Sequence, residues 1–193
     1  EMDGGNSSGI VEGISQTATV TAGRWVVRTR FGSTSQTGYS RLYPFYADDS
    51  NCWILYWNVN EGRILFRKYE SGSYTNLIDI TSVFPSDTEW HTIELLRDQN
   101  GGWTVLVDGD NKASATDSWL PSFTEIRLAT DGSGTTAGKH YFDNLYVTSY
   151  VSPEPSTSVG SEENRPSIVI IENITCDNTL IDRDVDWSGS GAV

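Results

Sequence analysis

Hydrophobic and polar residues alternate with a period of two along much of this chain. The clearest case lies within Trp90–Asp110, where the runs His91–Arg97 and Trp103–Asp108 flank the turn Gln99-Asn100-Gly101-Gly102. An Asn-Gly turn between two alternating runs is the strongest short-range sequence signal for a β-hairpin. The stretch therefore predicts two antiparallel strands joined by a tight turn.

Similar runs recur every ~8–12 residues, as in antiparallel sandwiches, and helical periodicity is hard to find. The run Cys52–Val59 is nearly continuously apolar, which predicts a strand covered on both faces. Residues 1–15 are expected to be a mobile lead-in that is able to form an edge strand. The other expected strands are Thr17–Val20, Trp25–Phe31, Tyr39–Tyr46, Arg63–Tyr69, Tyr74–Ile80, Lys112–Thr116, Thr124–Thr130 and Tyr141–Tyr150. The pattern predicts an all-β, two-sheet antiparallel sandwich over residues 1–151.

The composition changes at Ser152. Residues 152–167 are rich in proline, serine and glutamate, which predicts a flexible linker. Residues 168–193 form a β-prone tail that is too short to hold a core alone, or the truncated start of a following domain. The apolar run Ile168–Ile171 is expected to pair with an edge of its own sandwich or with the sheet of a neighbouring subunit. The sequence leaves both alternatives open.

The formal net charge of −13 argues against binding to nucleic acid and to an anionic membrane surface. No run is long enough to insert into a bilayer. The chain starts at Glu1 without an initiator methionine, and Asn6 and Asn173 stand in glycosylation sequons. We therefore expect an extracellular or cell-surface protein.

Two cysteines, Cys52 and Cys176, allow one disulfide or two free thiols. A bond between them would attach the C-terminal segment to the domain.

Several short motifs follow one another in a familiar order. They are Asp49-Ser50-Asn51, Gly62-Arg63-Ile64, Trp90-His91, Val107-Asp108-Gly109 and Tyr141-Phe142-Asp143-Asn144-Leu145. Over roughly residues 10–150 this order resembles the concanavalin A-like lectin/glucanase superfamily, in particular laminin-G-like modules of secreted and cell-surface microbial proteins. The resemblance implies a jelly roll of one convex and one concave sheet. Such modules mostly bind glycans or proteins, and some bind structural calcium.

The same superfamily contains glycoside hydrolases, whose retaining members carry a Glu-x-Asp-x-x-Glu strand. The acids Glu89, Glu94 and Glu125 have no acidic partners at that spacing, and HExxH, GxSxG and phosphate-loop motifs are absent from the sequence. The sequence therefore predicts a protein that is not an enzyme.

Asp143 is the first candidate metal ligand. It shares strand parity with Leu145 and Val147, so it is expected to face the core, where a carboxylate needs a partner. The resemblance implies structural calcium here, with further oxygens from Asp3 and Asp131. The alternative is an ion pair with Arg or Lys, or a solvent-exposed strand end. Weaker calcium candidates, on the alternation of acids in the tail, are Asp182, Asp184 and Asp186.

Arginine and tyrosine gather on successive predicted strands. The set comprises Arg28, Arg30, Arg41, Arg63, Arg67, Tyr39, Tyr43 and Tyr56. If these strands pair side by side, they form one Arg/Tyr surface, suited to the carboxylates or sulfates and the flat rings of an acidic polysaccharide. The alternative is that these arginines pair with the protein's own acids.

Trp57, Trp103 and Trp119 lie near strand ends or loops and are candidates for exposed sugar platforms. Core packing is the alternative for each of them.

These observations favour a non-catalytic extracellular carbohydrate-binding or adhesion module of a larger surface protein. A second hypothesis is a structural subunit of an extracellular filament or surface layer that self-associates through residues 168–181. A third is a glycan-active enzyme with an unrecognised site.

Overall fold

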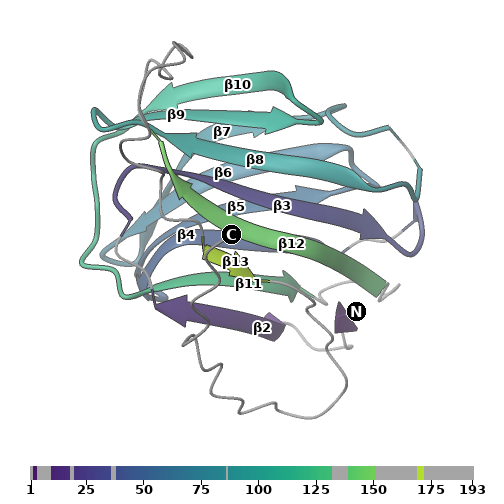
Figure 1. Cartoon of the computed structure of the whole chain (residues 1–193), viewed down its shortest axis with the longest axis horizontal. Helices are drawn as coiled ribbons and strands as arrows, with labels where there is room; N and C mark the ends of the chain where they lie inside the picture. Colours follow the sequence, from purple (N-terminus) through teal and green to yellow (C-terminus); the bar gives the residue numbers. More distant parts are fainter. Residues whose placement is uncertain are drawn as a thin grey trace, which may run out of the picture.

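The computed structural model describes residues 2–3, 10–17, 20–35, 38–85, 87–131, 139–150 and 169–171, with side chains for these residues except 2–3, 10–16, 131 and 169–171. All regular structure in these ranges is β-strand, arranged as two antiparallel sheets (Figure 1). The predicted all-β sandwich is confirmed. None of the described residues forms a helix long and apolar enough to cross a bilayer.

One sheet has seven strands. Its order is β1 (Met2–Asp3), β12 (Lys139–Ser149), β3 (Gly23–Phe31), β8 (His91–Arg97), β9 (Gly102–Val107) and β10 (Asp110–Thr116), and β13 (Val169–Ile171) also pairs with β12. We call it the seven-stranded sheet.

The other sheet has six strands. Its order is β2 (Ile10–Thr17), β11 (Glu125–Asp131), β4 (Tyr39–Asp48), β5 (Asn51–Asn58), β6 (Arg63–Glu70) and β7 (Ser73–Ile80). The chain passes from the seven-stranded to the six-stranded sheet between β3 and β4, so these two consecutive strands are not neighbours.

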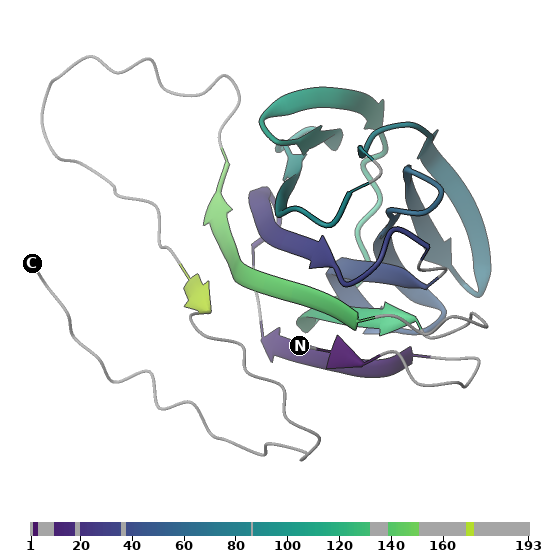
Figure 2. The same ribbon diagram turned by 90° about the vertical axis from the view of Figure 1, so that its right-hand side faces the viewer.

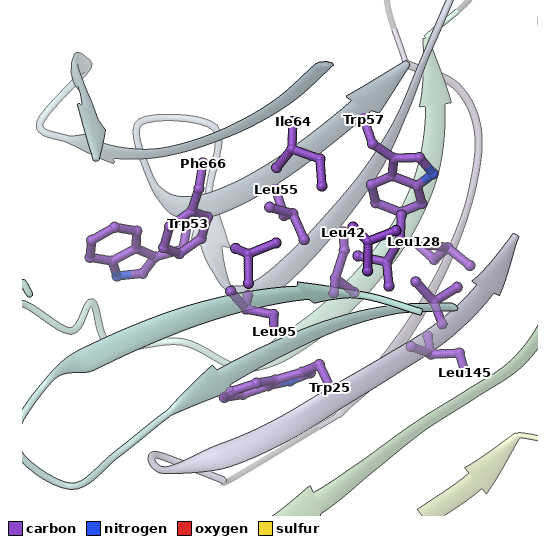
Figure 3. Close-up of a cluster of buried hydrophobic side chains, with 14 of the residues drawn as sticks. Trp25, Leu42, Trp53, Leu55, Trp57, Ile64, Phe66, Leu95, Leu128 and Leu145 are labelled. Carbon is purple, nitrogen blue, oxygen red and sulfur yellow. The ribbon is translucent and has the colours of Figure 1, made fainter. Parts of the chain in front are cut away.

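The core lies between the two sheets. Alternate residues of each strand point inward, as the period of two requires. Trp53, Leu55 and Trp57 of β5 meet Trp25 and Leu95 of the opposite sheet in one cluster (Figure 3). Trp25, Trp53, Trp57 and Trp103 are all fully buried and are the largest side chains of this core.

The predicted hairpin is present as β8 and β9. The carboxylate of Asp98 accepts hydrogen bonds from the backbone N–H groups of Asn100 and Gly102, at 2.8 and 2.7 Å. The next connection is the two-residue turn Asp108-Gly109, in which both residues have positive φ (53° and 83°). This backbone matches the twist of the flanking strands, so turn chemistry sets the register of β8, β9 and β10.

The N-terminal prediction was partly wrong. The expected strand Thr17–Val20 is not formed as such, since β2 ends at Thr17 and Val20 lies outside any strand. Instead, β2 (Ile10–Thr17) is an edge strand that pairs with β11, in line with the edge strand expected of the lead-in.

In the C-terminal region, Val169–Ile171 pairs with Leu145–Val147 of β12 (Figure 2). Of the two alternatives for the apolar run, this is the pairing with an edge of the chain's own sandwich. The linker 152–167, the rest of the tail, Asn6, Asn173, Cys176, Asp182, Asp184 and Asp186 lie outside the described residues.

Cys52 carries a free thiol and is 1% exposed. A free thiol is one of the two alternatives for the cysteines, and Cys176 lies outside the described residues.

Candidate ligand-binding face

The outer face of the six-stranded sheet carries a second cluster of apolar and aromatic side chains, separate from the core. On β5, Trp53 and Leu55 point into the sandwich, so Ile54 and Tyr56 point the other way. We call this outer surface the Tyr/Arg face. Its members are Tyr39, Arg41, Tyr43 and Tyr46 of β4, Cys52, Ile54 and Tyr56 of β5, Leu65, Arg67 and Tyr69 of β6, Tyr74 of β7, and Arg127 and Ala129 of β11.

A bulge in β4 brings two tyrosines to this face. Leu42 and Phe45 both point into the core although they are three residues apart, because the register shifts between them. Tyr43 and Tyr46 consequently both face outward, with ring centroids 5.6 Å apart at 84°.

Arginines lie over the tyrosine rings across the face. The guanidinium carbon of Arg127 lies 3.4 Å from the ring centroid of Tyr46. Those of Arg41 and Arg67 both lie 5.1 Å from the ring of Tyr56. The positive charges thus rest against aromatic faces, an arrangement stabilised by cation–π attraction.

Tyr74 gives the face its accessible ring. It is 61% exposed, whereas Tyr43, Tyr46 and Tyr56 are all buried. Tyr74 stands directly opposite Tyr69 in the β6–β7 register, with ring centroids 6.0 Å apart, and the guanidinium carbon of Arg67 lies 4.8 Å from its ring. The β7 side of the face therefore presents a solvent-facing aromatic ring beside a cation.

Tyr43, Tyr46 and Tyr56 are neutral hydroxyl groups at pH 7. Burial raises the pKa of Tyr43 and of Tyr56, and burial together with the hydrogen bond to Asp49 raises the pKa of Tyr46 to about 12. Burial likewise raises the pKa of Cys52 to about 12, which keeps its thiol protonated and unreactive.

Acids lie at two sides of the face and are paired. Arg63 donates to both carboxylate oxygens of Asp79 at 2.8 Å, and Tyr39 donates to Glu61 at 2.7 Å. The Arg63 hydrogen bonds hold the pKa of Asp79 below its usual value. On the β11 side, Arg127 donates to Glu125 at 2.8 Å.

Arg67 differs from these arginines. Within the described part of the chain, its one hydrogen bond runs from Nη1 to the hydroxyl of Tyr69 at 3.4 Å. Among the side chains that the structure describes, no carboxylate lies within 4.0 Å of it.

Two of the predicted arginines lie elsewhere. Arg28 and Arg30 belong to β3 in the seven-stranded sheet, where both lie near the Trp90 ring, at 5.0 and 5.2 Å. The prediction of one shared surface was wrong for them, because the chain changes sheets between β3 and β4. It is right for Arg41, Tyr43, Tyr56 and Arg67, which the structure brings together.

Two of the predicted tryptophan platforms are also wrong. Trp57 and Trp103 are 0% exposed and belong to the core. Both side chains point inward, from strands that have a neighbouring strand on each side. Trp119 is half-buried, packs 5.9 Å from Trp53 and lies 5.6 Å from the ammonium of Lys68.

Asp143 does not face the core. The register of β12 shifts after Asp143, and Asn144 takes a positive φ of 53°, so Leu145 points inward while Asp143 points outward. Asp143 instead forms an ion pair with Arg28 at 3.3 Å, both being well exposed. The described part of the chain shows no cluster of three or more metal-ligating side chains. The side chains of Asp3 and Asp131 lie outside it, so calcium at this end of β12 stays a prediction.

The sequence reasoning missed Tyr46, Tyr69, Tyr74 and Arg127. A signal for one pair was present: Tyr69 and Tyr74 flank the turn Ser71-Gly72 symmetrically, and Ser71 and Gly72 both have positive φ. A two-residue turn of this kind places its flanking residues opposite each other.

Comparison with known proteins gives a likeness in structure alone. No protein-family model matches the sequence, and a search of curated proteins found no match. Among solved structures, a Bacillus licheniformis β-glucanase superposes with a TM-score of 0.51 at 15% identity, over 66% of this chain and 64% of that one. The globular domain of T. cruzi calreticulin superposes with a TM-score of 0.51 at 14% identity, over 70% of this chain and 68% of that one. The carbohydrate-binding module CBM66 of Bacillus subtilis superposes with a TM-score of 0.49 at 14% identity, over 68% of this chain and 75% of that one.

The first two matches show the fold. The chain folds as a two-sheet jelly-roll β-sandwich similar to those of the glucanase and the calreticulin domain. It spans less than two thirds of the glucanase.

Proposed function

We propose that this chain is a non-catalytic carbohydrate-binding module and that the Tyr/Arg face is its binding surface. The observation that carries this proposal is the exposed ring of Tyr74 beside the guanidinium of Arg67. A sugar ring presents a flat apolar face edged by hydroxyl groups. An exposed aromatic ring can pack against the apolar face of the sugar, and neighbouring hydroxyl and guanidinium groups can form hydrogen bonds with the sugar hydroxyl groups.

The surroundings of Tyr74 support this role. The ring is placed by the β6–β7 pairing and by its contacts with Tyr69 and Arg67, so it is held in position before any ligand arrives. Preorganised aromatic groups bind with little loss of side-chain entropy. The exposed ring thus has the properties of a binding anchor, and a purely structural role would be expected to bury it.

The acids near the face support a non-catalytic role. Glycoside hydrolysis needs one protonated carboxylic acid with a raised pKa and a second carboxylate facing it. Glu61, Asp79 and Glu125 are each held by Tyr39, Arg63 or Arg127, and the pKa of Asp79 is lowered. The absence of a Glu-x-Asp-x-x-Glu motif from the sequence agrees with this role.

We place the module outside the cell, as one part of a longer surface or secreted protein. This part of the proposal is supported by the sequence resemblance and by the strongly acidic composition, which favours solubility.

A glycan array tests the proposal with three proteins: the full chain, Tyr74→Ala and Tyr141→Ala. Tyr141 is a matched control because it is a half-buried tyrosine under an arginine on the outer face of the opposite sheet. The full chain and Tyr141→Ala are expected to retain the same glycans, and Tyr74→Ala is expected to lose them. Equal retention by all three proteins would remove the Tyr/Arg face from consideration. Shortened products after incubation with a retained glycan would overturn the non-catalytic assignment.

A further inference from the structure

We infer that the carbohydrate held at the Tyr/Arg face is anionic, with a carboxylate or sulfate group bound by Arg67. This inference rests on the proposed function and adds the chemical class of the ligand to it. It is carried by the surroundings of Arg67, by the pairing of most other described arginines, and by the position of Tyr74.

The guanidinium of Arg67 has unused binding capacity. An arginine side chain carries five N–H donors in a planar fork. Arg67 uses one of them in the hydrogen bond to Tyr69, and its Nε is buried without a protein partner. The rings of Tyr56 and Tyr74 lie 5.1 and 4.8 Å from its guanidinium carbon. These rings attract the cation but accept none of its N–H groups in the plane of the fork.

Most of the other arginines that the structure describes are matched to an acceptor. Carboxylates accept from Arg24, Arg28, Arg63 and Arg127, and backbone carbonyls accept from the buried Arg97. The chain has 26 acidic residues against 13 lysines and arginines, so protein carboxylates are plentiful. An arginine that has no described carboxylate within ion-pair distance, in so acidic a chain, is best explained by an anion that comes from outside.

Arg30 is the nearest parallel. It too lies between two aromatic rings, Trp90 at 5.2 Å and Tyr141 at 4.4 Å, and its Nε is buried without a partner. However, its rings are both half-buried, whereas Arg67 adjoins the 61% exposed ring of Tyr74. Arg67 therefore combines an anion-binding fork with an accessible platform, and Arg30 serves as its internal control.

The guanidinium of Arg67 and the exposed ring of Tyr74 suit one sugar unit. A uronic acid or a sulfated sugar carries its anionic group on the rim of the ring, next to the face that packs on an aromatic side chain. The 4.8 Å between the Arg67 guanidinium carbon and the Tyr74 ring puts the fork beside that platform. A planar fork matches the two oxygens of a carboxylate or sulfate in a bidentate pair.

The net charge of −13 distinguishes binding of an anion at Arg67 from general attraction of polyanions to a basic surface. The protein as a whole repels a polyanion at long range, and salt at ~0.15 M screens that repulsion beyond about 8 Å while a close ion pair is weakened less. Affinity for the anionic ligand is therefore expected to hold or rise between low and physiological salt. Simple ion exchange on a basic surface would lose affinity over the same range.

The test uses polysaccharide pairs that share a backbone and differ in charge. The pairs are hydroxyethyl cellulose with carboxymethyl cellulose, methyl-esterified with de-esterified polygalacturonate, and dextran with dextran sulfate. Titration calorimetry compares the full chain with Arg67→Gln, Arg67→Lys, Tyr74→Ala and Arg30→Gln. The first two pairs isolate a carboxylate and the third isolates a sulfate, so the comparison also identifies which anion is recognised.

We expect at least tenfold tighter binding to the charged member of one or more pairs. Arg67→Gln is expected to remove that preference, Arg67→Lys to keep part of it, and Arg30→Gln to leave it unchanged. The inference is overturned, and the proposed function stands, if charged and neutral members bind equally and Tyr74→Ala weakens both. It is also overturned if Arg30→Gln costs as much affinity as Arg67→Gln. If the full chain binds no member of any pair and no glycan on the array, the inference and the proposed function are both overturned.

Discussion

Nδ1 of His91 lies 2.8 Å from a carboxylate oxygen of Asp108, and Nε2 on the other side of the ring lies 3.0 Å from Asp87. The imidazole is buried, and its ring packs 5.8 Å from that of Phe84. The three side chains connect the start of β8, the β9–β10 turn and the loop before β8. The pair of carboxylates stabilises the charged form of His91.

The first prediction concerns pH. Burial opposes protonation of His91, but the hydrogen bonds to Asp108 and Asp87 outweigh it and raise its pKa above 6.5. The hydrogen bond from His91 lowers the pKa of Asp87 below 3.8. The contribution of His91 to the free energy of unfolding is thus present below about pH 6.5 and is lost as the pH rises through the folded-state pKa. The contribution of Asp87 is present above about pH 3.8 and is lost as the pH falls through its lowered folded-state pKa. Urea unfolding from about pH 2 to 9 measures both limbs.

Asp108→Asn is the matched variant for this prediction. Asparagine tolerates the positive φ of position 108 and keeps an acceptor for the backbone N–H of Thr92. With the charge removed, the pKa of His91 is expected to fall, and the loss of stability should begin at lower pH. NMR titration follows the ring directly, since the chain has only two histidines. An unchanged His91 pKa in the variant would contradict this account.

The second prediction compares two glycines with the same backbone. Gly101 and Gly109 both have φ of 83°. A Cβ at position 101 would lie 2.6 Å from Cα of Ser118 and 2.7 Å from the carbonyl oxygen of Asp117, whereas at position 109 nothing lies within 4 Å. Gly109→Ala should cost about 1–2 kcal/mol from backbone strain alone. Gly101→Ala should cost more by about 1–3 kcal/mol from overpacking, and chemical denaturation of both measures the difference.

The third prediction concerns the aromatic core. The ring of Trp103 lies 4.7 Å from that of Phe66 and 5.0 Å from that of Trp53, and its Nε1 donates to the carbonyl of Asp117 at 3.2 Å. Trp103→Ala should lower the free energy of unfolding by about 3–5 kcal/mol. Thermal and denaturant unfolding give the value. A loss below about 1 kcal/mol would contradict the placement of Trp103 at the centre of the core.

The fourth prediction separates binding from stability at Tyr74. Because its side chain is 61% exposed, Tyr74→Ala should change the free energy of unfolding by only about 0.5 kcal/mol. The same variant should weaken carbohydrate binding about tenfold, equal to about 1.4 kcal/mol. Calorimetry and denaturant unfolding on one preparation give both values. A large loss of stability would mean that Tyr74 is mainly structural.

The sequence predicted the sandwich well because its strands carry a clean period of two and its turns carry Asn-Gly and Asp-Gly pairs. The strand predicted at Cys52–Val59, which is β5 (Asn51–Asn58) in the structure, is an example. Trp53, Leu55 and Trp57 fill the core, while Ile54 and Tyr56 are buried on the other face. Each of these properties is local to the strand, so it is visible before the fold is known.

The site was harder to predict, because it depends on which strands become neighbours. Arg28 and Arg41 stand on consecutive strands that belong to different sheets, and no local pattern marks that crossing. Bulges caused the second kind of error. One extra residue at Asn144 turns Asp143 outward to Arg28, and parity counted along the sequence does not detect it.

Backbone NMR of the uniformly labelled 21.3 kDa chain, titrated with its best-binding oligosaccharide, tests the central claim most directly. The account predicts that the largest amide shift changes occur along β5, β6 and β7, around Tyr56, Arg67 and Tyr74. Changes concentrated at Arg28, Arg30 and Tyr141 on the opposite sheet would contradict it.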